Sequence, residues 1–112
     1  MGDVYRQNKR SKNQEPYSLP RSYLEAIGKV DFSMPYNFVT TNDIIGGNSG
    51  SPAFNTQGEV VGLIFDGNLP QLSNRFLYRD TKERSVSVHA HGLVHVLKHV
   101  YSAHDLVREL GF

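Results

Sequence analysis

The feature that most constrains this chain is a glycine-rich turn placed between two apolar runs. Residues 46–52 have the sequence GGNSGSP, with three glycines, two serines, an asparagine and a proline. Glycine adopts backbone angles that are closed to other residues, and proline cannot donate to a strand ladder, so the segment predicts a tight turn. Two explanations stay open at this point. The turn is a plain loop, or it presents Ser49 beside backbone N–H groups, as acyl-transfer sites do.

Hydrophobic periodicity on both sides of the turn predicts antiparallel strands followed by a helix. The segment TQGE places a glycine at the reversal of a hairpin. Beyond the last predicted strand, Leu and Val recur at helical spacing toward the C-terminus, with one break. We therefore expect strands at 36–40, 51–55, 60–66 and 85–90, a loop at 67–74, a short helix at 22–30 and a terminal helix over 91–110.

Composition places the chain in a broad class. Its 112 residues are enough for one small domain. Twelve basic residues nearly balance eleven acidic ones, for a net charge of +1, so charge makes no case for nucleic acid or an anionic membrane surface. The chain has no cysteine, which excludes disulfides and thiolate metal sites. No apolar run is long enough to span a membrane.

The first part of the chain differs from the rest. Residues 1–20 are polar and without periodicity, and they lack the apolar region of a signal peptide. We expect them to be a disordered tail or a connector from something larger. Residues 21–112 are then expected to form the folded part.

A nucleophilic serine needs an exposed hydroxyl, a base, and N–H donors where the oxyanion forms. A glycine at position 47 lets its N–H and that of Ser49 point the same way. Gly50 keeps the space beyond the serine open. Each such donor contributes about 3–4 kcal/mol of transition-state stabilisation. The turn therefore supplies two of the three requirements.

The motif GNSGSP resembles the G-[DN]-S-G-[GS]-P turn of chymotrypsin-fold serine peptidases. The longer run from PYNFVTTNDIIGGNSGSP through GLIFDGN, followed by SVSV and a helix ending YSAHDLVREL, closely resembles the C-terminal part of bacterial dipeptidyl-peptidases of the seven and eleven type. The match covers roughly residues 15–111. It implies a mainly β fold, an antiparallel chymotrypsin-like half-barrel with a C-terminal α-helix, as a fragment of a double β-barrel peptidase.

The resemblance implies roles for particular residues. Ser49 would be the acylating nucleophile, and the N–H groups of Gly47 and Ser49 would form the oxyanion hole. Asp66 would bind the free α-ammonium of the substrate, which is chemically sensible because a carboxylate pairs well with an ammonium. Gly67 would leave the specificity pocket open for apolar or aromatic side chains, since members that prefer acidic side chains carry Arg there. Asn68 matches the pattern, without a definite role.

Ordinary structural roles compete with two of these assignments. Asp66 and Gly67 stand in a D-G-N sequence, which is a common turn signal. Asp66 would then only initiate the turn, and Gly67 would only permit its backbone angles.

The residues that would complete a catalytic triad are absent from the predicted positions. In the resembled fold, the histidine and the acid precede the serine, whereas all five histidines of this chain follow it: His89, His91, His95, His99 and His104. None is a credible base. We therefore expect a C-terminal fragment of a chain of several hundred residues, which carries the nucleophile and is inactive alone.

The histidines suggest one alternative function. His91, His95 and His99 are spaced four residues apart, so a helix would line them on one stripe that could bind a metal ion. The run lacks a neighbouring acid at a metal-site spacing, and a solvated or packed helix face explains it as well. We expect no metal and no cofactor.

The hypothesis from the sequence is a serine dipeptidyl-peptidase that releases dipeptides from peptide N-termini. Its partners would be peptide substrates, with neither nucleic acid nor membrane, and the resemblance allows a homodimer of the full-length enzyme. The resemblance also implies a periplasmic, cell-surface or secreted parent enzyme. The alternatives are a non-catalytic, truncated module that binds peptides, and a histidine-rich metal-binding domain.

Overall fold

The structure, a computed structural model, describes all of residues 1–112. The chain divides into two compact units. We call Tyr36–His91 the sheet unit, and Met1–Pro35 together with Gly92–Phe112 the helical unit. In neither unit does a helix reach the length and apolar character that crossing a membrane requires.

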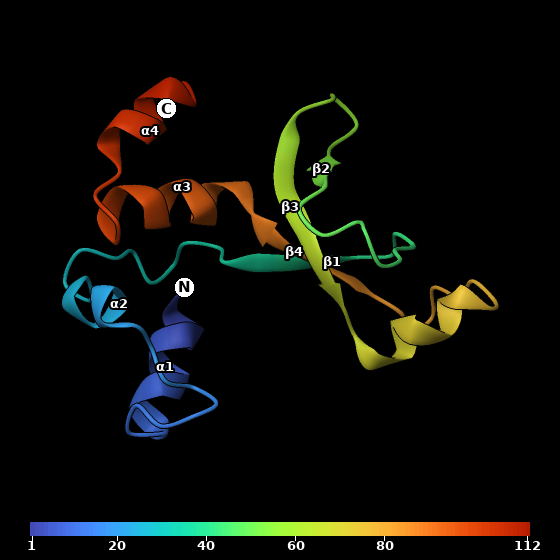
Figure 1. The fold of residues 1–112 in the computed structure, drawn as a ribbon, viewed down its shortest axis with the longest axis horizontal. Coiled ribbons are helices and arrows are strands. Elements are labelled where there is room, and N and C mark those ends of the chain that lie inside the picture. The colour runs from blue at the N-terminus through green and yellow to red at the C-terminus, as the bar shows by residue number, and fades with distance from the viewer. The chain divides into compact units, whose positions relative to one another are not determined.

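The sheet unit contains four antiparallel strands in the order β1-β4-β3-β2 (Figure 1). They are β1 (Asn37–Thr40), β2 (Pro52–Phe54), β3 (Val60–Gly67) and β4 (Ser85–His89). Each strand lies where alternating or continuous apolar residues predict it, and β2 and β3 form the expected hairpin. The expected antiparallel sheet is thus confirmed, as an open sheet.

An irregularity in β3 decides which side chains reach the surface near its end. Ile64 pairs with Ser87 and Asp66 pairs with Val86, so Phe65 is an extra residue in the ladder. Such a bulge re-aims the side chains that follow it. Ile64 is buried at 9% exposure, whereas Phe65 is 51% exposed and the next residue, Asp66, is also exposed.

The two faces of the sheet are covered unequally. Ser85 and Ser87 of β4 are 0% and 1% exposed, so their face is closely packed. Val39 and Val86, which are register partners on the opposite face, are less covered, and Val39 is 59% exposed. This unit alone therefore leaves an apolar face partly open.

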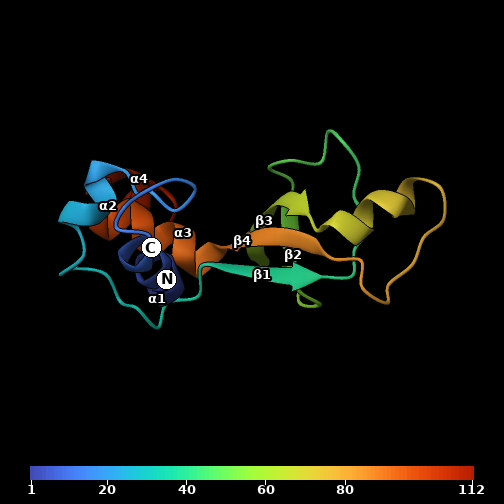
Figure 2. The same cartoon turned by 90° about the horizontal axis from the view of Figure 1, so that it is seen from below.

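The segment after β3, expected to be a loop, contains the 3₁₀ helix η1 (Leu69–Arg75), which leads toward β4 (Figure 2). Asn68 caps it, because its side-chain oxygen accepts a hydrogen bond from the N–H of Gln71 at 3.1 Å. Pro70 stands in its first turn, where a missing N–H costs nothing. The expected loop at 67–74 is thus corrected to a segment that is largely helical.

The helical unit contains α1 (Gly2–Arg10), α2 (Arg21–Glu25), α4 (His104–Glu109) and most of α3 (Ala90–His99). The first residues, expected to be a disordered tail or a connector, form α1. Tyr5 explains this difference, since it is 6% exposed, donates to the carbonyl of Tyr23 at 2.9 Å and packs against Phe32 with ring centroids 5.5 Å apart. A helix that buries an aromatic side chain is held by tertiary packing.

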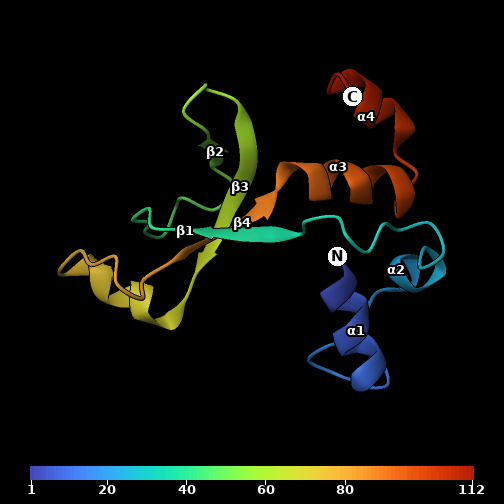
Figure 3. The same cartoon turned by 180° about the vertical axis from the view of Figure 1, so that it is seen from behind.

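The single terminal helix that was expected is interrupted. α3 ends at His99 and α4 begins at His104, and the chain changes direction between them (Figure 3). Ser102 has a φ of 53°, which a continuous helix does not permit. The predicted helix over 91–110 is therefore two helices.

His95 makes the stability of the helical unit depend on pH. His95 is 9% exposed, and its Nε2 accepts a hydrogen bond from the N–H of Asp31 at 3.0 Å, which requires an imidazole without a proton on Nε2. Burial lowers the pKa of His95 below its ordinary value of 6.5, and the nearby His99 lowers it further, as the N-terminal amine does, while the Asp31 carboxylate raises it. The fold thus favours neutral His95, so the unfolded chain binds more protons between the two pKa values.

The stability contributed by His95 is therefore complete above pH 6.5 and is lost as the pH falls through the lowered pKa of the folded state. We expect the thermal midpoint of the chain to drop between pH 7 and pH 5. A His95→Gln variant keeps an acceptor for the Asp31 N–H but does not titrate, so its midpoint should fall less. The exposed His104, changed to Gln, is the matched control, and an equal pH response of all three proteins would contradict the prediction.

Candidate functional site

The glycine turn is shaped by Asn48, the residue before the candidate nucleophile. Asn48 Oδ1 accepts from the N–H of Ile45 at 2.8 Å, and its own N–H donates to the Ile45 carbonyl at 3.2 Å. Its carbonyl accepts from the N–H of Ser51 at 2.9 Å. Gly47 has a φ of 103° and Gly50 a φ of 85°, so both positions require glycine. Asn48 thus closes the turn on both sides of Ser49.

Backbone hydrogen bonds hold this turn against β3. The N–H of Gly50 donates to the carbonyl of Ile64 at 2.7 Å, and the N–H of Ile64 donates to the carbonyl of Ser51 at 2.9 Å. Ser49 is exposed, and its Oγ lies 3.5 Å from the Phe65 carbonyl oxygen, at the long limit of a hydrogen bond. The hydroxyl is therefore presented at the surface beside the bulge of β3.

The donors that an oxyanion needs are unused. The N–H groups of Gly47 and Ser49 donate to no acceptor within the chain, whereas the N–H of Gly50 is taken by β3. Two unused N–H groups that flank one residue are the pattern expected of an oxyanion hole. This role for Gly47 stays a prediction.

A cleft of about 160 Å³ brings three of the predicted site residues together. Ser49, Asp66 and Gly67 all line it. Gly47 and Asn68 are not among its lining residues. The cleft lies wholly within the sheet unit, between the glycine turn, the end of β3 and η1.

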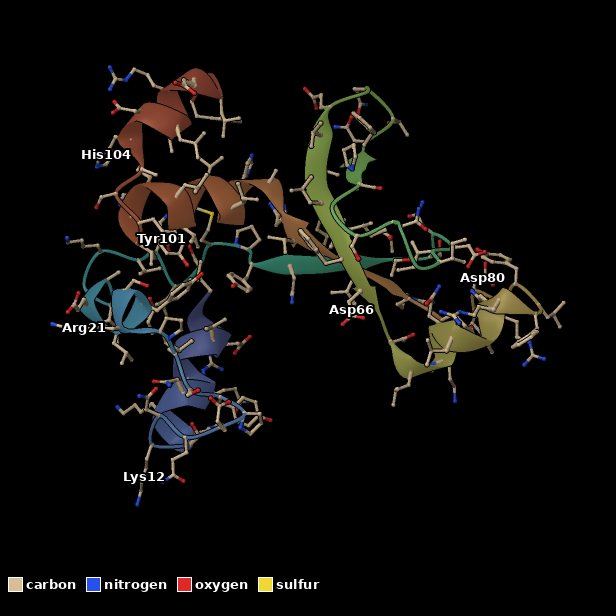
Figure 4. The ribbon with its side chains drawn as sticks, viewed as in Figure 1. Lys12, Arg21, Asp66, Asp80, Tyr101 and His104 are labelled. Atoms are coloured by element: carbon tan, nitrogen blue, oxygen red, sulfur yellow. The ribbon has the colours of Figure 1, made fainter.

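Asp66 carries an exposed carboxylate on β3 (Figure 4). One of its oxygens accepts a hydrogen bond from the N–H of Gly67 at 2.8 Å. No ion pair within the chain uses the carboxylate. An unpaired anion at the edge of the cleft is suited to a cationic ligand group.

Asn68 has a structural role that its sequence position did not disclose. Its Oδ1 accepts from the N–H groups of Gln71 and Arg84, at 3.1 Å and 3.0 Å, and its Nδ2 donates to the Lys82 carbonyl at 2.6 Å. The backbone N–H of Asn68 donates to the Arg84 carbonyl at 2.9 Å. The side chain therefore ties the start of η1 to the segment before β4. A contact of Asn68 with substrate stays a prediction.

Three residues of η1 line the cleft and were missed by sequence reasoning: Gln71, Leu72 and Arg75. Gln71 donates from Nε2 to the carbonyl of Ile44 at 2.6 Å, which anchors the segment that enters the glycine turn. Arg75 makes no ion pair and places a positive charge on the same cleft as Asp66. Only the fold of η1 brings them here, and no motif in the sequence marks them.

No histidine of the chain contacts the serine. The only polar neighbour of Ser49 Oγ within hydrogen-bond range is the Phe65 carbonyl, so these residues supply no base for it. His89 Nδ1 accepts from the N–H of His91, and burial lowers the pKa of His89. Nowhere in the chain do three or more His, Asp or Glu side chains gather in a way that could hold a metal ion. The alternative of a histidine metal site therefore gains no support.

Comparisons with known proteins agree on one family of peptidases. A family model described as Peptidase S46 matches residues 4–112. Dipeptidyl-peptidase 7 of Capnocytophaga gingivalis is 36% identical over 80 residues, which cover 64% of this chain and 11% of that protein. The Asp/Glu-specific dipeptidyl-peptidase of Shewanella putrefaciens is 30% identical over 126 residues, covering 86% of this chain and 17% of that protein.

Solved structures agree with these similarities. The crystal structure of Porphyromonas endodontalis DPP11 in complex with the dipeptide Arg-Asp superposes with a TM-score of 0.75 at 26% identity, covering 88% of this chain and 16% of that one. The antiparallel sheet with its helices thus matches part of a much larger protein. The chain spans between 11% and 17% of the length of these relatives.

Proposed function

Because this chain belongs to the peptidase S46 family, we propose that it is the C-terminal part of a serine dipeptidyl-peptidase that releases dipeptides from peptide N-termini. In this proposal the open sheet is one half of a chymotrypsin-like double barrel. The partly exposed apolar face that includes Val39 is where the rest of such a core would pack. The family relationship, together with the small share of each relative that the chain covers, supports this assignment.

The observation that carries the proposal is the shared cleft of Ser49, Asp66 and Gly67. In the proposed reaction Ser49 Oγ attacks the carbonyl of the second residue of the substrate, and its proton passes to a base from outside these 112 residues. The unused N–H groups of Gly47 and Ser49 receive the developing oxyanion. The base then gives this proton to the leaving amine, and water hydrolyses the acyl-enzyme. Asp66 fixes the register by holding the free α-ammonium, and Gly67 borders the specificity pocket.

Serine-directed labelling tests the proposal. The full-length protein that contains these residues should react with a fluorophosphonate, and peptide mapping should place the label on Ser49. The labelled band should be several times larger than 12.6 kDa. An intact, folded protein that stays unlabelled would favour the second candidate, a non-catalytic peptide-binding module, for which the missing contact between Ser49 and any histidine is the motivating observation.

Asp66 provides a separate prediction. In the full-length protein, Asp66→Ala should lower kcat/KM for peptides with a free N-terminus by about 10–100-fold, the range of a lost charged hydrogen bond. The rate of Ser49 labelling should stay unchanged, because the label has no ammonium. The matched control is Asp80→Asn, which removes a carboxylate from the same unit away from the cleft (Figure 4). Equal losses of turnover and labelling would make Asp66 a structural residue.

A further inference from the structure

Gln71 is the most deeply buried polar side chain of the candidate cleft, at 5% exposure. Its backbone N–H is bonded to Asn68, at the start of η1. Its side chain is bonded to the carbonyl of Ile44, just before the glycine turn. The position of the amide is therefore set from two separate segments of the sheet unit, which makes it a fixed part of the cleft wall.

The hydrogen bond to Ile44 also decides which way the amide faces. A carbonyl oxygen only accepts, so the nitrogen of the amide must be the atom that lies 2.6 Å from it. The oxygen, Oε1, then points elsewhere, and no donor in the chain reaches it. Ser87 Oγ is the only fully buried side-chain oxygen or nitrogen without a partner, so Oε1 keeps contact with solvent. Gln71 thus presents an acceptor that no group of the chain occupies.

Gly67 lies next to this acceptor. A Cβ at position 67 would stand 2.5 Å from Oε1 of Gln71 and 3.0 Å from its Cδ. Gly67 is the last residue of β3, it pairs with Ser85, and its φ is not in the left-handed region. A side chain at position 67 would therefore displace the end of the Gln71 side chain, and no turn geometry constrains this position.

These contacts bear on which substrate side chains the cleft can accept. The absence of a side chain at position 67 was expected to leave room for apolar or aromatic groups. In the structure that room is taken by the amide of Gln71, whose oxygen also makes this part of the wall polar. A large apolar side chain would both collide with the amide and strip water from Oε1 without replacing its hydrogen bond.

We propose that Gln71 is the specificity-determining residue of this site, and that its Oε1 selects a short substrate side chain that carries an O–H or N–H donor. The substrate class is thus peptides whose second residue is Ser, Thr or Asn. This inference rests on the proposed function, because it concerns the residue whose carbonyl Ser49 attacks. Buried acceptors discriminate strongly against ligands that leave them unpaired.

The preference of the unaltered protein is the first test. The full-length protein is given dipeptidyl substrates that differ only in the second residue, with Ser, Thr, Asn, Ala, Leu or Phe at that place. We expect kcat/KM for Ser, Thr and Asn to exceed that for Leu and Phe by about tenfold or more. A preference for Leu or Phe would overturn the proposal without any variant.

Two variants distinguish the effect of the size of the amide on substrate preference from the effect of its hydrogen bond. Gln71→Ala should raise kcat/KM for Phe and Leu about tenfold or more and remove the advantage of Ser over Ala. Gln71→Met keeps most of the volume, so it should remove the advantage of Ser without helping Phe. Gln57→Ala, in the exposed β2–β3 turn, is the matched control. An unchanged profile in Gln71→Ala would overturn the inference.

The rate of fluorophosphonate labelling of Ser49, measured for every protein, keeps the two levels of the proposal distinguishable. Wild-type labelling with the wrong preference overturns the role of Gln71 alone, whereas no labelling of folded wild-type protein overturns the proposed function and this inference together.

A thermal test covers the case in which a variant folds poorly. Gly67→Ala should lower the thermal midpoint, and adding Gln71→Ala should restore part of the loss, because the clash is between these two residues. A Gly67→Ala protein as stable as wild type would contradict the contact.

Discussion

Ser49→Ala is expected to abolish fluorophosphonate labelling and to lower kcat of the full-length protein on the order of 10⁶-fold, the scale on which serine peptidases depend on their nucleophile. The physical reason is that alanine has no oxygen to form the acyl-enzyme. The hydroxyl makes only one long contact, 3.5 Å from the Phe65 carbonyl, so its removal should leave the fold intact. Turnover of dipeptidyl substrates and circular dichroism together check both parts.

The same motif offers a matched control for this substitution. Ser51 stands two residues further along GNSGSP, and only its backbone N–H and carbonyl take part in hydrogen bonds. Ser51→Ala should therefore retain labelling and turnover. Retained turnover in Ser49→Ala, or equal losses in both variants, would remove Ser49 from the chemistry and leave the turn as a structural loop.

Gly62→Ala is expected to destabilise the sheet unit by about 3 kcal/mol, at the upper end for overpacking a core. A Cβ at position 62 would stand 2.4 Å from the carbonyl oxygen of Val88 and 2.6 Å from Cε1 of Phe38. Val88 belongs to β4, which is paired with β1 on one side and β3 on the other. Its backbone cannot retreat without breaking ladder hydrogen bonds.

The measurement for this prediction is thermal unfolding followed by circular dichroism. A loss of about 3 kcal/mol corresponds to a thermal midpoint that is lower by roughly 10–20 °C for a domain of this size. Gly46→Ala is the matched control in the same unit, since nothing lies within 4 Å of the Cβ it would add and its φ is ordinary. Equal midpoints for wild type and Gly62→Ala would show that Phe38 and β4 do not close on β3 as described.

Sequence periodicity was sufficient to predict the strands, because strand formation here depends on the local pattern of residue types. Residues such as Val60 and Ile64 carry the apolar, β-branched side chains that a half-buried strand favours, and β2 and β3 are joined by a turn whose glycine, Gly58, has a φ of 81°. The same periodicity predicted one terminal helix and did not predict its break near Ser102. Periodicity could not predict α1, whose formation depends on Tyr5 meeting Tyr23 and Phe32.

Of the candidate site, only the parts that depend on a short stretch of sequence could be predicted. The motif around Ser49 specifies a turn, because the positive φ values of Gly47 and Gly50 are a property of that segment alone. Its relation to Asp66 was expected only through resemblance, and the structure places both on one cleft. The bulge at Phe65, which accompanies the exposure of Asp66, arises from the register between β3 and β4 and has no local signal.

By itself, the sequence determined the antiparallel strands, the glycine turn with its serine, and the membership in a peptidase family, because these depend on local residue types and on a long matching run. Only the tertiary structure decided what surrounds Gly67. Gln71 is four residues further along the chain, and it reaches Gly67 because Asn68 caps η1 and Ile44 holds the amide. A hydrogen bond between residues 44 and 71 is a non-local contact, and no pattern in either segment encodes it.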